Sequence, residues 1–341
     1  MNRRHLWLGV AAVAALSAWL WLRDVNPSTK DIQKMSTHTE KMTTHCVGRF
    51  LIDVPQKATM SEGSYEFEIA SLKTKTTSPL PQAELLRKLD AEMAQRAAGL
   101  ARPPTELGDK TKFHARYQPG VSTRSMRYIK SNGDDVMDGY VVTDGRIFEL
   151  QTNTNDDNDV KELNDFLMEL APTLRARETS EIPTTPGFCF DGGLTSMNPK
   201  RGENVSWGWD LEGHPDVHFG LSIRTNGNKV GPGIVEREGE FIKEMGALIS
   251  QVRMLRKRHL VLSGMKAQEW SMTDTSEKSD YYFQIEIPGL PNDNSAPKIS
   301  MSLSVGGNGK DGYVAPSLSE GKALALWDAV VPTLRLRPGA I

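Results

Sequence analysis

The stretch Ala171–Arg177 reads APTLRAR, and 160 residues later Val331–Arg337 reads VPTLRLR. Each copy closes a segment with helical apolar spacing. The two copies of this repeat are separated by about the length of one ordinary domain. This separation indicates a chain of two related halves rather than a solenoid of short repeats. Because a proline late in a helix removes a backbone hydrogen bond, Pro172 and Pro332 are expected to end their helices. The leucine of each copy should return to the core, while the arginines should face water or the end of a helix dipole.

The apolar patterns before the two copies follow one order: two strands, a helix, a meander of strands and a final helix. In the first half, Leu85 and Leu89 share a face of the first helix, and the dipeptide Asn132-Gly133 is a tight-turn signal within the meander. In the second half, residues 241–252 have the corresponding helical spacing. Hairpin-linked strands with few helices are typical of α+β proteins. We therefore predict two similar α+β domains, each an antiparallel sheet with helices on one face, preceded by an N-terminal transmembrane helix and a tether.

Changes in composition mark the expected boundaries. The segment before Cys46 is rich in Ser, Thr and Lys and lacks apolar periodicity, which indicates a flexible tether. Pro183 and Pro186 lie in a polar stretch that is typical of a linker. The predicted division is a signal anchor at 1–23, a flexible tether at 24–45, an N-terminal domain at 46–177, a linker at 178–186 and a C-terminal domain at 187–341.

The N-terminal segment is expected to enter a membrane. Two arginines and a histidine precede an uncharged apolar run, residues 6–22, which is at the lower limit of length for a transmembrane helix. The basic flank keeps this end in the cytoplasm, so the rest of the chain is expected in the periplasm. Trp19 and Trp21 suit a membrane–water interface and favour an uncleaved anchor in the inner membrane. Cleavage after Ser17, giving a soluble periplasmic protein, stays open as the alternative.

Composition and motifs exclude several function classes. With 41 basic and 43 acidic residues the net charge is −2, so the chain lacks the basic excess of a nucleic-acid-binding protein. The segment from His214 to His218, with Asp216 between them, comes nearest to a metal site, but its spacing matches no known zinc pattern. A solvated strand edge explains it more simply. We predict no catalytic residue, no metal and no cofactor, and therefore a protein that is not an enzyme.

Two residue pairs have two interpretations each. Cys46 and Cys189 open the two halves, and in an oxidising compartment they either form a disulfide between the domains or stay as buried free thiols. Trp207 and Trp209 share one face of a strand. They either pack against a helix in the core or, if exposed, anchor a protein partner.

The segment Cys46–Pro55 reads CVGRFLIDVP and Gly187–Gly193 reads GFCFDGG, one at the head of each half. These motifs resemble the two-domain type VI secretion immunity proteins that neutralise a phospholipase effector, and the resemblance covers nearly all of the folded chain. It implies an exported inhibitor that grips a secreted lipase with both domains and blocks substrate access or lid opening. A protein of this kind needs no catalytic cluster, and we expect it to be monomeric when free.

The resemblance does not supply contact residues. From the sequence we select an aromatic anchor, Trp207 and Trp209, and a charged rim, Asp156, Asp157 and Asp159, as candidates for binding the partner. A cell-envelope scaffold or assembly factor is the alternative function, because a tether and two α+β modules would serve it equally well. A hydrolase centred on the two-histidine segment is a third hypothesis.

Overall fold

The computed structural model describes residues 24–61, 63–76, 79–103, 108–225, 227–275, 280–309 and 312–341. The expected membrane anchor at residues 6–22 therefore lies outside the described residues. Within them, no helix combines the length and the apolar character that crossing a membrane requires. The chain is an α+β protein with mostly antiparallel strands, as predicted.

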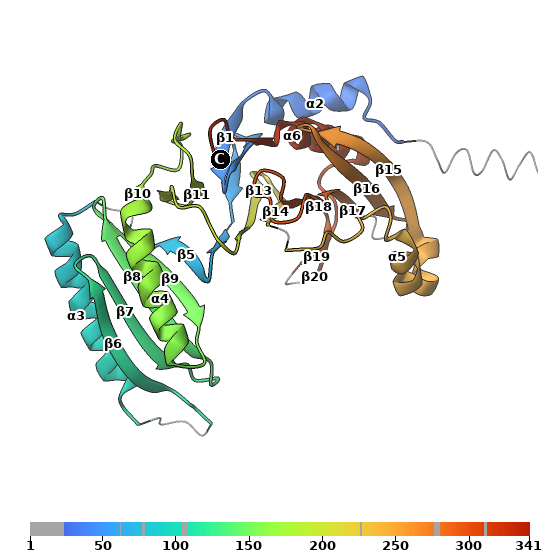
Figure 1. Cartoon of the computed structure of the whole chain (residues 1–341). Helices are drawn as coiled ribbons and strands as arrows, with labels where there is room; N and C mark the ends of the chain where they lie inside the picture. The colour runs from blue at the N-terminus through green and yellow to red at the C-terminus, as the bar shows by residue number, and fades with distance from the viewer. Residues whose placement is uncertain are drawn as a thin grey trace, which may run out of the picture.

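A single thirteen-stranded sheet runs through both halves of the molecule. Figure 1 shows β6 to β9 of the first half on one side of the molecule and β13 to β18 of the second half on the other. The first half contributes β3 (Ala58–Met60), β4 (Ser64–Phe67), β5 (Ala70–Thr74), β6 (Lys112–Gly120), β7 (Thr123–Ile129), β8 (Asp135–Thr143) and β9 (Arg146–Asn153). The second half contributes β13 (Glu203–Leu211), β14 (His214–Arg224), β15 (Val252–Leu262), β16 (Met265–Asp274), β17 (Tyr281–Ile287) and β18 (Lys298–Val305). A small hairpin, β19 (Gly307–Gly309) and β20 (Gly312–Val314), follows.

The order of strands in this sheet displays the internal repeat. From the centre outward, the first half runs β4-β5-β9-β8-β7-β6 and the second half runs β13-β14-β18-β17-β16-β15. These two orders correspond strand for strand, and β4 pairs antiparallel with β13 where the halves meet. The sheet does not stop at the predicted linker. The two halves are therefore two similar lobes that share one sheet, and the predicted division into two domains is not confirmed.

Helices cover the two faces of the sheet unequally. They are α2 (Thr29–Thr39), α3 (Gln82–Leu100), α4 (Asp157–Leu170), α5 (Glu238–Met245) and α6 (Glu320–Val330), with short 3-10 turns η1 (Ala171–Thr173), η2 (Gly246–Gln251) and η3 (Val331–Thr333). Helices α4 and α6 bury their side chains in the same large core, which extends through both lobes. Helix α3 packs on the opposite face of the first lobe and has a separate core. The predicted core positions of α4, from Val160 to Leu170, are buried, so that prediction is confirmed.

The hairpin that opens each half pairs with the strand that ends the other half. Strands β1 (Met42–Val47) and β2 (Phe50–Pro55) form a sheet with β21 (Arg335–Leu336), while β11 (Phe188–Phe190) and β12 (Gly193–Thr195) form one with β10 (Leu174–Ala176). Both short terminal strands belong to the repeated heptapeptide. Hydrophobic patterning identifies strands but not the edge to which each one pairs, because any free edge offers the same backbone groups. The exchange was therefore not predicted.

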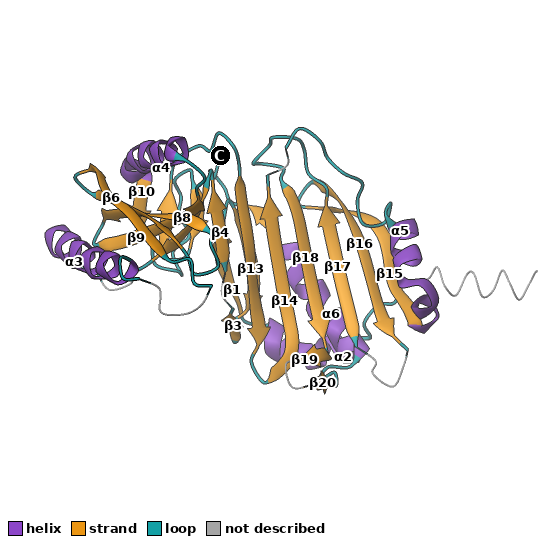
Figure 2. Cartoon of the chain, turned by 90° about the horizontal axis from the view of Figure 1, so that it is seen from below, coloured by secondary structure: helices purple, strands orange, loops and turns teal. Residues whose placement is uncertain are grey.

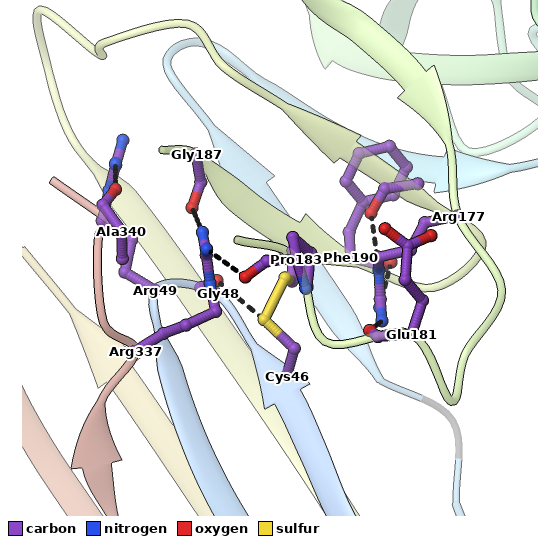
Figure 3. The surroundings of a disulfide bond; sticks show 12 residues. Cys46, Gly48, Arg49, Arg177, Glu181, Pro183, Gly187, Phe190, Arg337 and Ala340 are labelled. Atoms are coloured by element: carbon purple, nitrogen blue, oxygen red, sulfur yellow. Dashed lines mark hydrogen bonds between the residues drawn. A yellow bond between two sulfur atoms is a disulfide. The ribbon is translucent and has the colours of Figure 1, made fainter. Parts of the chain in front are cut away.

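The repeated heptapeptide ends each helix as expected, but two of its arginines are buried. Helices α4 and α6 end immediately before the two copies, and Leu174 and Leu334 lie in the core. The prediction that the arginines face water is wrong for Arg177 and Arg337, which are 2% and 1% exposed. Their guanidinium groups donate to backbone carbonyls of the loops between and around the exchanged hairpins (Figure 3). Burial lowers the pKa of both side chains.

The predicted flexible tether is wrong, because residues 24–45 contain helix α2 and the start of β1. Ser28 caps the helix in a reciprocal capping box with Asp31. Met35 is 2% exposed and belongs to the large core, and α2 packs along α6. A single buried side chain on an otherwise polar helix gives little apolar periodicity, which is why the sequence pattern missed it.

Replacing Met35 with alanine is expected to lower the free energy of unfolding by about 2–4 kcal/mol, because it removes a buried side chain and leaves a cavity. Urea denaturation of residues 24–341 measures this. Thr37 is exposed on the same helix, so Thr37→Ala serves as the control and should change stability by less than about 0.5 kcal/mol. Equal stabilities for Met35→Ala and the parent chain would mean that α2 is not part of the folded core.

Candidate partner-binding surface

The two exchanged hairpins are joined where they meet. Cys46 of β1 and Cys189 of β11 form a disulfide with a Cα–Cα distance of 5.9 Å (Figure 3). The backbones of Gly48 and Cys189 exchange two hydrogen bonds, of 2.9 and 2.7 Å, beside it. The sequence left open whether these cysteines form a disulfide or stay as buried free thiols, and the structure contains the disulfide. It connects the two halves across the centre of the molecule.

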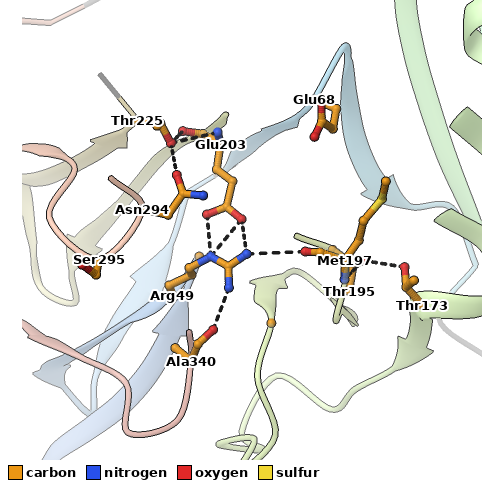
Figure 4. A network of polar contacts seen from close by, with 12 residues as sticks. Arg49, Glu68, Thr173, Thr195, Met197, Glu203, Thr225, Asn294, Ser295 and Ala340 are labelled. Carbon is orange, nitrogen blue, oxygen red and sulfur yellow. Dashed lines mark hydrogen bonds and ion pairs between the residues drawn. The ribbon is translucent and has the colours of Figure 1, made fainter. Parts of the chain in front are cut away.

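An ion pair also links the halves beside the disulfide. Arg49, directly before β2, contacts the carboxylate of Glu203 on β13 through three hydrogen bonds of 2.6–2.9 Å (Figure 4). Its remaining donors reach the carbonyls of Ala340, at 2.6 Å, and Met197. Both side chains are more than nine-tenths buried. Burial raises the pKa of Glu203, while the guanidinium of Arg49 opposes that rise.

The tryptophan pair proposed as a partner anchor lies in the core. Trp207 is 3% exposed and Trp209 is 1% exposed. The Trp209 ring stacks on Phe219 at a centroid distance of 4.7 Å, and the Trp207 ring lies 5.3 Å from that of His45. Burial was the other interpretation of this pair, and these side chains offer no surface to a partner. We therefore leave them out of the proposed interface.

The acidic turn at the start of α4 serves mainly as a helix cap. Asp156 is the N-cap residue and accepts hydrogen bonds from the backbone amides of Asn158 and Asp159. These backbone donors lower the pKa of Asp156. Asp159 in turn accepts from the amide of Asn155. The side chain of Asp157 is 99% exposed and pairs with Arg127 at 3.0 Å, so it is the member of this turn best placed to meet a partner.

The two-histidine segment does not converge on one centre. The Nδ1 atom of His214 lies 2.7 Å from the hydroxyl of Ser317, and Asp216 is buried and accepts from the Ser317 amide. His218 points to the other side and pairs with Asp210 at 2.6 Å. Among the described residues, no group of three His, Cys, Asp or Glu side chains is placed to hold a metal ion.

A broad polar face of the second lobe is a surface that the sequence analysis missed. On β13, β14, β17 and β18, one set of alternate residues is buried against α6 and α2, and the other set points away from these helices. Figure 2 views this open face, with α6 and α2 behind the strands. The side chains on it include Ser206, Asp210, His218, Ser222, Arg224, Tyr282, Gln284, Ser300, Ser302 and Ser304. The alternating KISMSLSV stretch of β18 carries the signal for it.

The second half of the chain is similar to a known protein family. Residues 181–339 match the family model described as the Tle cognate immunity protein 4 C-terminal domain. The resemblance to type VI secretion immunity proteins is therefore confirmed. No curated protein sequence matches the chain.

Solved structures of immunity proteins share the whole fold. The apo immunity protein TplEi of the type VI secretion system of Pseudomonas aeruginosa is 22% identical, with a TM-score of 0.70 over 90% of this chain and 99% of that chain. TplEi complexed with an "L" peptide gives a TM-score of 0.69 at 22% identity, over 88% and 99% of the two chains. A chain of the Tle4–Tli4 complex gives 0.71 at 22% identity, with the same coverage. The likeness extends through both lobes.

Proposed function

We propose that this chain is an immunity protein that binds and inhibits a type VI secreted phospholipase. The observation that carries the proposal is the match of residues 181–339 to the Tle cognate immunity protein family. The fold shared with TplEi and with a chain of the Tle4–Tli4 complex supports it for the remaining part of the chain. Inhibition by binding needs no catalytic group in the inhibitor, so the protein acts without being an enzyme.

The fixed arrangement of the two lobes is suitable for holding a partner protein between them. The shared sheet, the exchanged hairpins and the disulfide all connect the lobes, so their relative orientation is held before a partner arrives. A binding surface that is already ordered loses little conformational entropy on association, which favours tight binding. We propose that both lobes contact the enzyme and block substrate access or the opening of its lid. Asp157 is a candidate for the charged rim of this contact.

We place this activity in the periplasm. A disulfide persists in an oxidising compartment and is rare in the cytosol, so the bond between Cys46 and Cys189 supports export. If residues 6–22 remain as an inner-membrane anchor, the inhibitor is held at the surface that a phospholipase attacks. Such tethering raises the effective concentration of the inhibitor toward a membrane-bound enzyme.

The test uses purified residues 24–341 and their proposed partner, a phospholipase effector of the type VI secretion system. We expect a complex of one inhibitor to one enzyme, and loss of phospholipid hydrolysis in proportion to the inhibitor added. A secreted phospholipase of a different family, assayed in parallel, should keep its full activity. If no complex forms at micromolar concentrations and the chain instead co-purifies with envelope machinery, the proposal fails and the scaffold function takes its place.

A further inference from the structure

A cavity of about 490 Å³ lies at the edge of the second lobe, between α5, η2 and the strands β15 and β16. Figure 1 places this end of the molecule opposite to α3 and β6 of the first lobe. The apolar side chains that line the cavity are Ile242, Ile249, Val252, Met254, Leu255 and Trp270. A concave, mostly apolar site of this size is typical of sites that take small molecules.

Helix α5 leaves the cavity open because it is short. The helix predicted over residues 241–252 ends at Met245, and Gly246 has a φ of +53°, a left-handed conformation that favours glycine. The chain continues as the 3-10 turn η2. No side chain described in α5 is buried, and Ile242, which lines the cavity, is 44% exposed. Apolar surface is therefore accessible here.

Trp270 gives the cavity wall a buried donor without a partner. This residue is 5% exposed, and its indole N–H has no hydrogen-bond partner among the residues that the structure describes. An unpaired buried donor is costly, so the cavity favours a ligand with an oxygen acceptor next to an apolar part. Tryptophan is also enriched at the interfacial layer of membranes, because its ring combines an apolar body with a polar N–H.

The start of the described chain places this cavity close to the expected membrane anchor. Asp24 lines the cavity, and the backbone amide of Val25 donates to the carbonyl of Leu255 at 2.9 Å. Arg256 donates to the Val25 carbonyl at 2.8 Å. The apolar run 6–22 ends two positions before Asp24, and two residues of extended chain reach about 7 Å. The headgroup layer on each side of a bilayer is about 5–8 Å thick, so an anchor that spans the bilayer holds the cavity at headgroup level.

The charges around the cavity suit a phospholipid headgroup. Strand β15 has no acidic residue and carries Arg253, Arg256, Lys257 and Arg258. The two acidic residues of the cavity lining are each paired with a cation of this strand, Asp24 with Arg258 and Glu238 with Lys257. Lys257 and Glu238 are each about one-third exposed, so a lipid phosphate would compete with this carboxylate for the ammonium group.

We propose that the cavity takes one acyl chain of a phospholipid from the membrane in which the N-terminal segment is anchored. The inference rests on the inner-membrane anchor proposed above. An acyl chain that leaves the bilayer needs another apolar environment, which the cavity lining supplies, while the headgroup stays at the rim beside Lys257. The bound lipid also fixes an orientation, in which the second lobe faces the membrane and the first lobe lies farther from it (Figure 1).

The test uses the full chain in vesicles of phosphatidylethanolamine and phosphatidylglycerol, in which part of the lipid carries a photoreactive diazirine on an acyl chain. Irradiation attaches the lipid covalently to the nearest residues, and mass spectrometry of the digested protein locates them. We expect lipid adducts in residues 6–22 and also at Val252 and Met254 of the cavity lining.

A matched pair of variants locates the lipid within the second lobe. Ile242→Glu should lower the adduct yield at Val252 and Met254 by at least about tenfold, because an acyl chain in the cavity would have to remove water from the new carboxylate. Ile32 is also exposed but lies on α2, outside the cavity lining. Ile32→Glu should therefore change the same yield by less than about twofold. Thermal unfolding checks that each variant folds.

Each outcome has a distinct meaning. If adducts form in residues 6–22 but not in the cavity lining, this inference is wrong while the proposed anchor stands. If Ile242→Glu leaves the yield at the cavity unchanged, the acyl chain lies elsewhere and the inference is likewise wrong. If adducts form in neither place, the proposed anchor fails and the inference fails with it. Should Ile242→Glu not fold, Ser250→Glu, at an exposed site of the cavity lining, decides by the same criterion.

Discussion

Replacing both Cys46 and Cys189 with alanine is expected to lower the free energy of unfolding by about 5 kcal/mol. The disulfide joins residues separated by 143 positions. In the chain-entropy model a cross-link that closes a loop of this length restricts the unfolded chain by about that amount. Alanine is suitable because both sites are buried and apolar, so the replacement leaves no unpaired polar group. Urea denaturation in the absence of reductant measures the difference.

The same experiment with reductant supplies the control. Reduced parent protein should unfold near the midpoint of the double alanine variant, and reductant should leave the variant itself unchanged. A loss below about 1 kcal/mol would contradict the prediction, since it would mean that the unfolded chain is already restricted without the bond. The activity assay then separates stability from function, because the exchanged hairpins should keep the lobes together in the folded variant.

Replacing Arg49 with methionine is expected to lower the free energy of unfolding by about 3–5 kcal/mol at neutral pH. The change leaves the carboxylate of Glu203 buried without its partner, which costs much more than a surface ion pair contributes. It also removes the donor to the carbonyl of Ala340 near the end of the chain. The double variant Arg49→Met/Glu203→Gln is the matched control and should recover a substantial part of the loss, because it removes the unpaired charge.

The pH dependence of this loss has a definite sign. Burial raises the pKa of Glu203 in the folded protein, and removing Arg49 takes away the group that opposes this rise. A carboxyl group whose folded pKa is raised gives greater stability below that pKa, and this stability is lost as pH rises through it. The difference between Arg49→Met and the parent should therefore shrink as the pH is lowered from 7 toward 5. A difference independent of pH would mean that lost packing, and not the stranded carboxylate, causes the effect.

Local patterns in the sequence were sufficient for most elements. The spacing from Val160 to Leu170 gave the buried face of α4, and the prolines of the repeated heptapeptide gave the ends of α4 and α6. The alternation in β13 placed Trp207 and Trp209 on one face, but strand alternation alone does not say which face meets the core. That choice depends on where α6 and α2 pack, and those contacts join residues distant in sequence.

The other wrong predictions also concern contacts between residues that are distant in sequence. Arg177 and Arg337 were expected to face water or the end of a helix dipole, where positive charge is mildly favourable, but both are buried. They are buried because the loops between the exchanged hairpins leave carbonyl groups that need donors, and a guanidinium has five. The open face was missed because strand alternation does not say which face of the sheet α6 and α2 cover.

The exchange of hairpins also determines which strand pairs can form only at the end of folding. Phe50, near the start of the folded part, pairs with Leu336 near its end. The sheet of β1, β2 and β21 therefore cannot be completed until the last residues of the chain are present. A chain that crosses a membrane from its N-terminus cannot close this sheet during passage. Contacts between residues this distant in sequence slow folding. In the periplasmic location proposed above, the chain would arrive unfinished, and β21 would be the last strand to enter and the one that completes the first sheet.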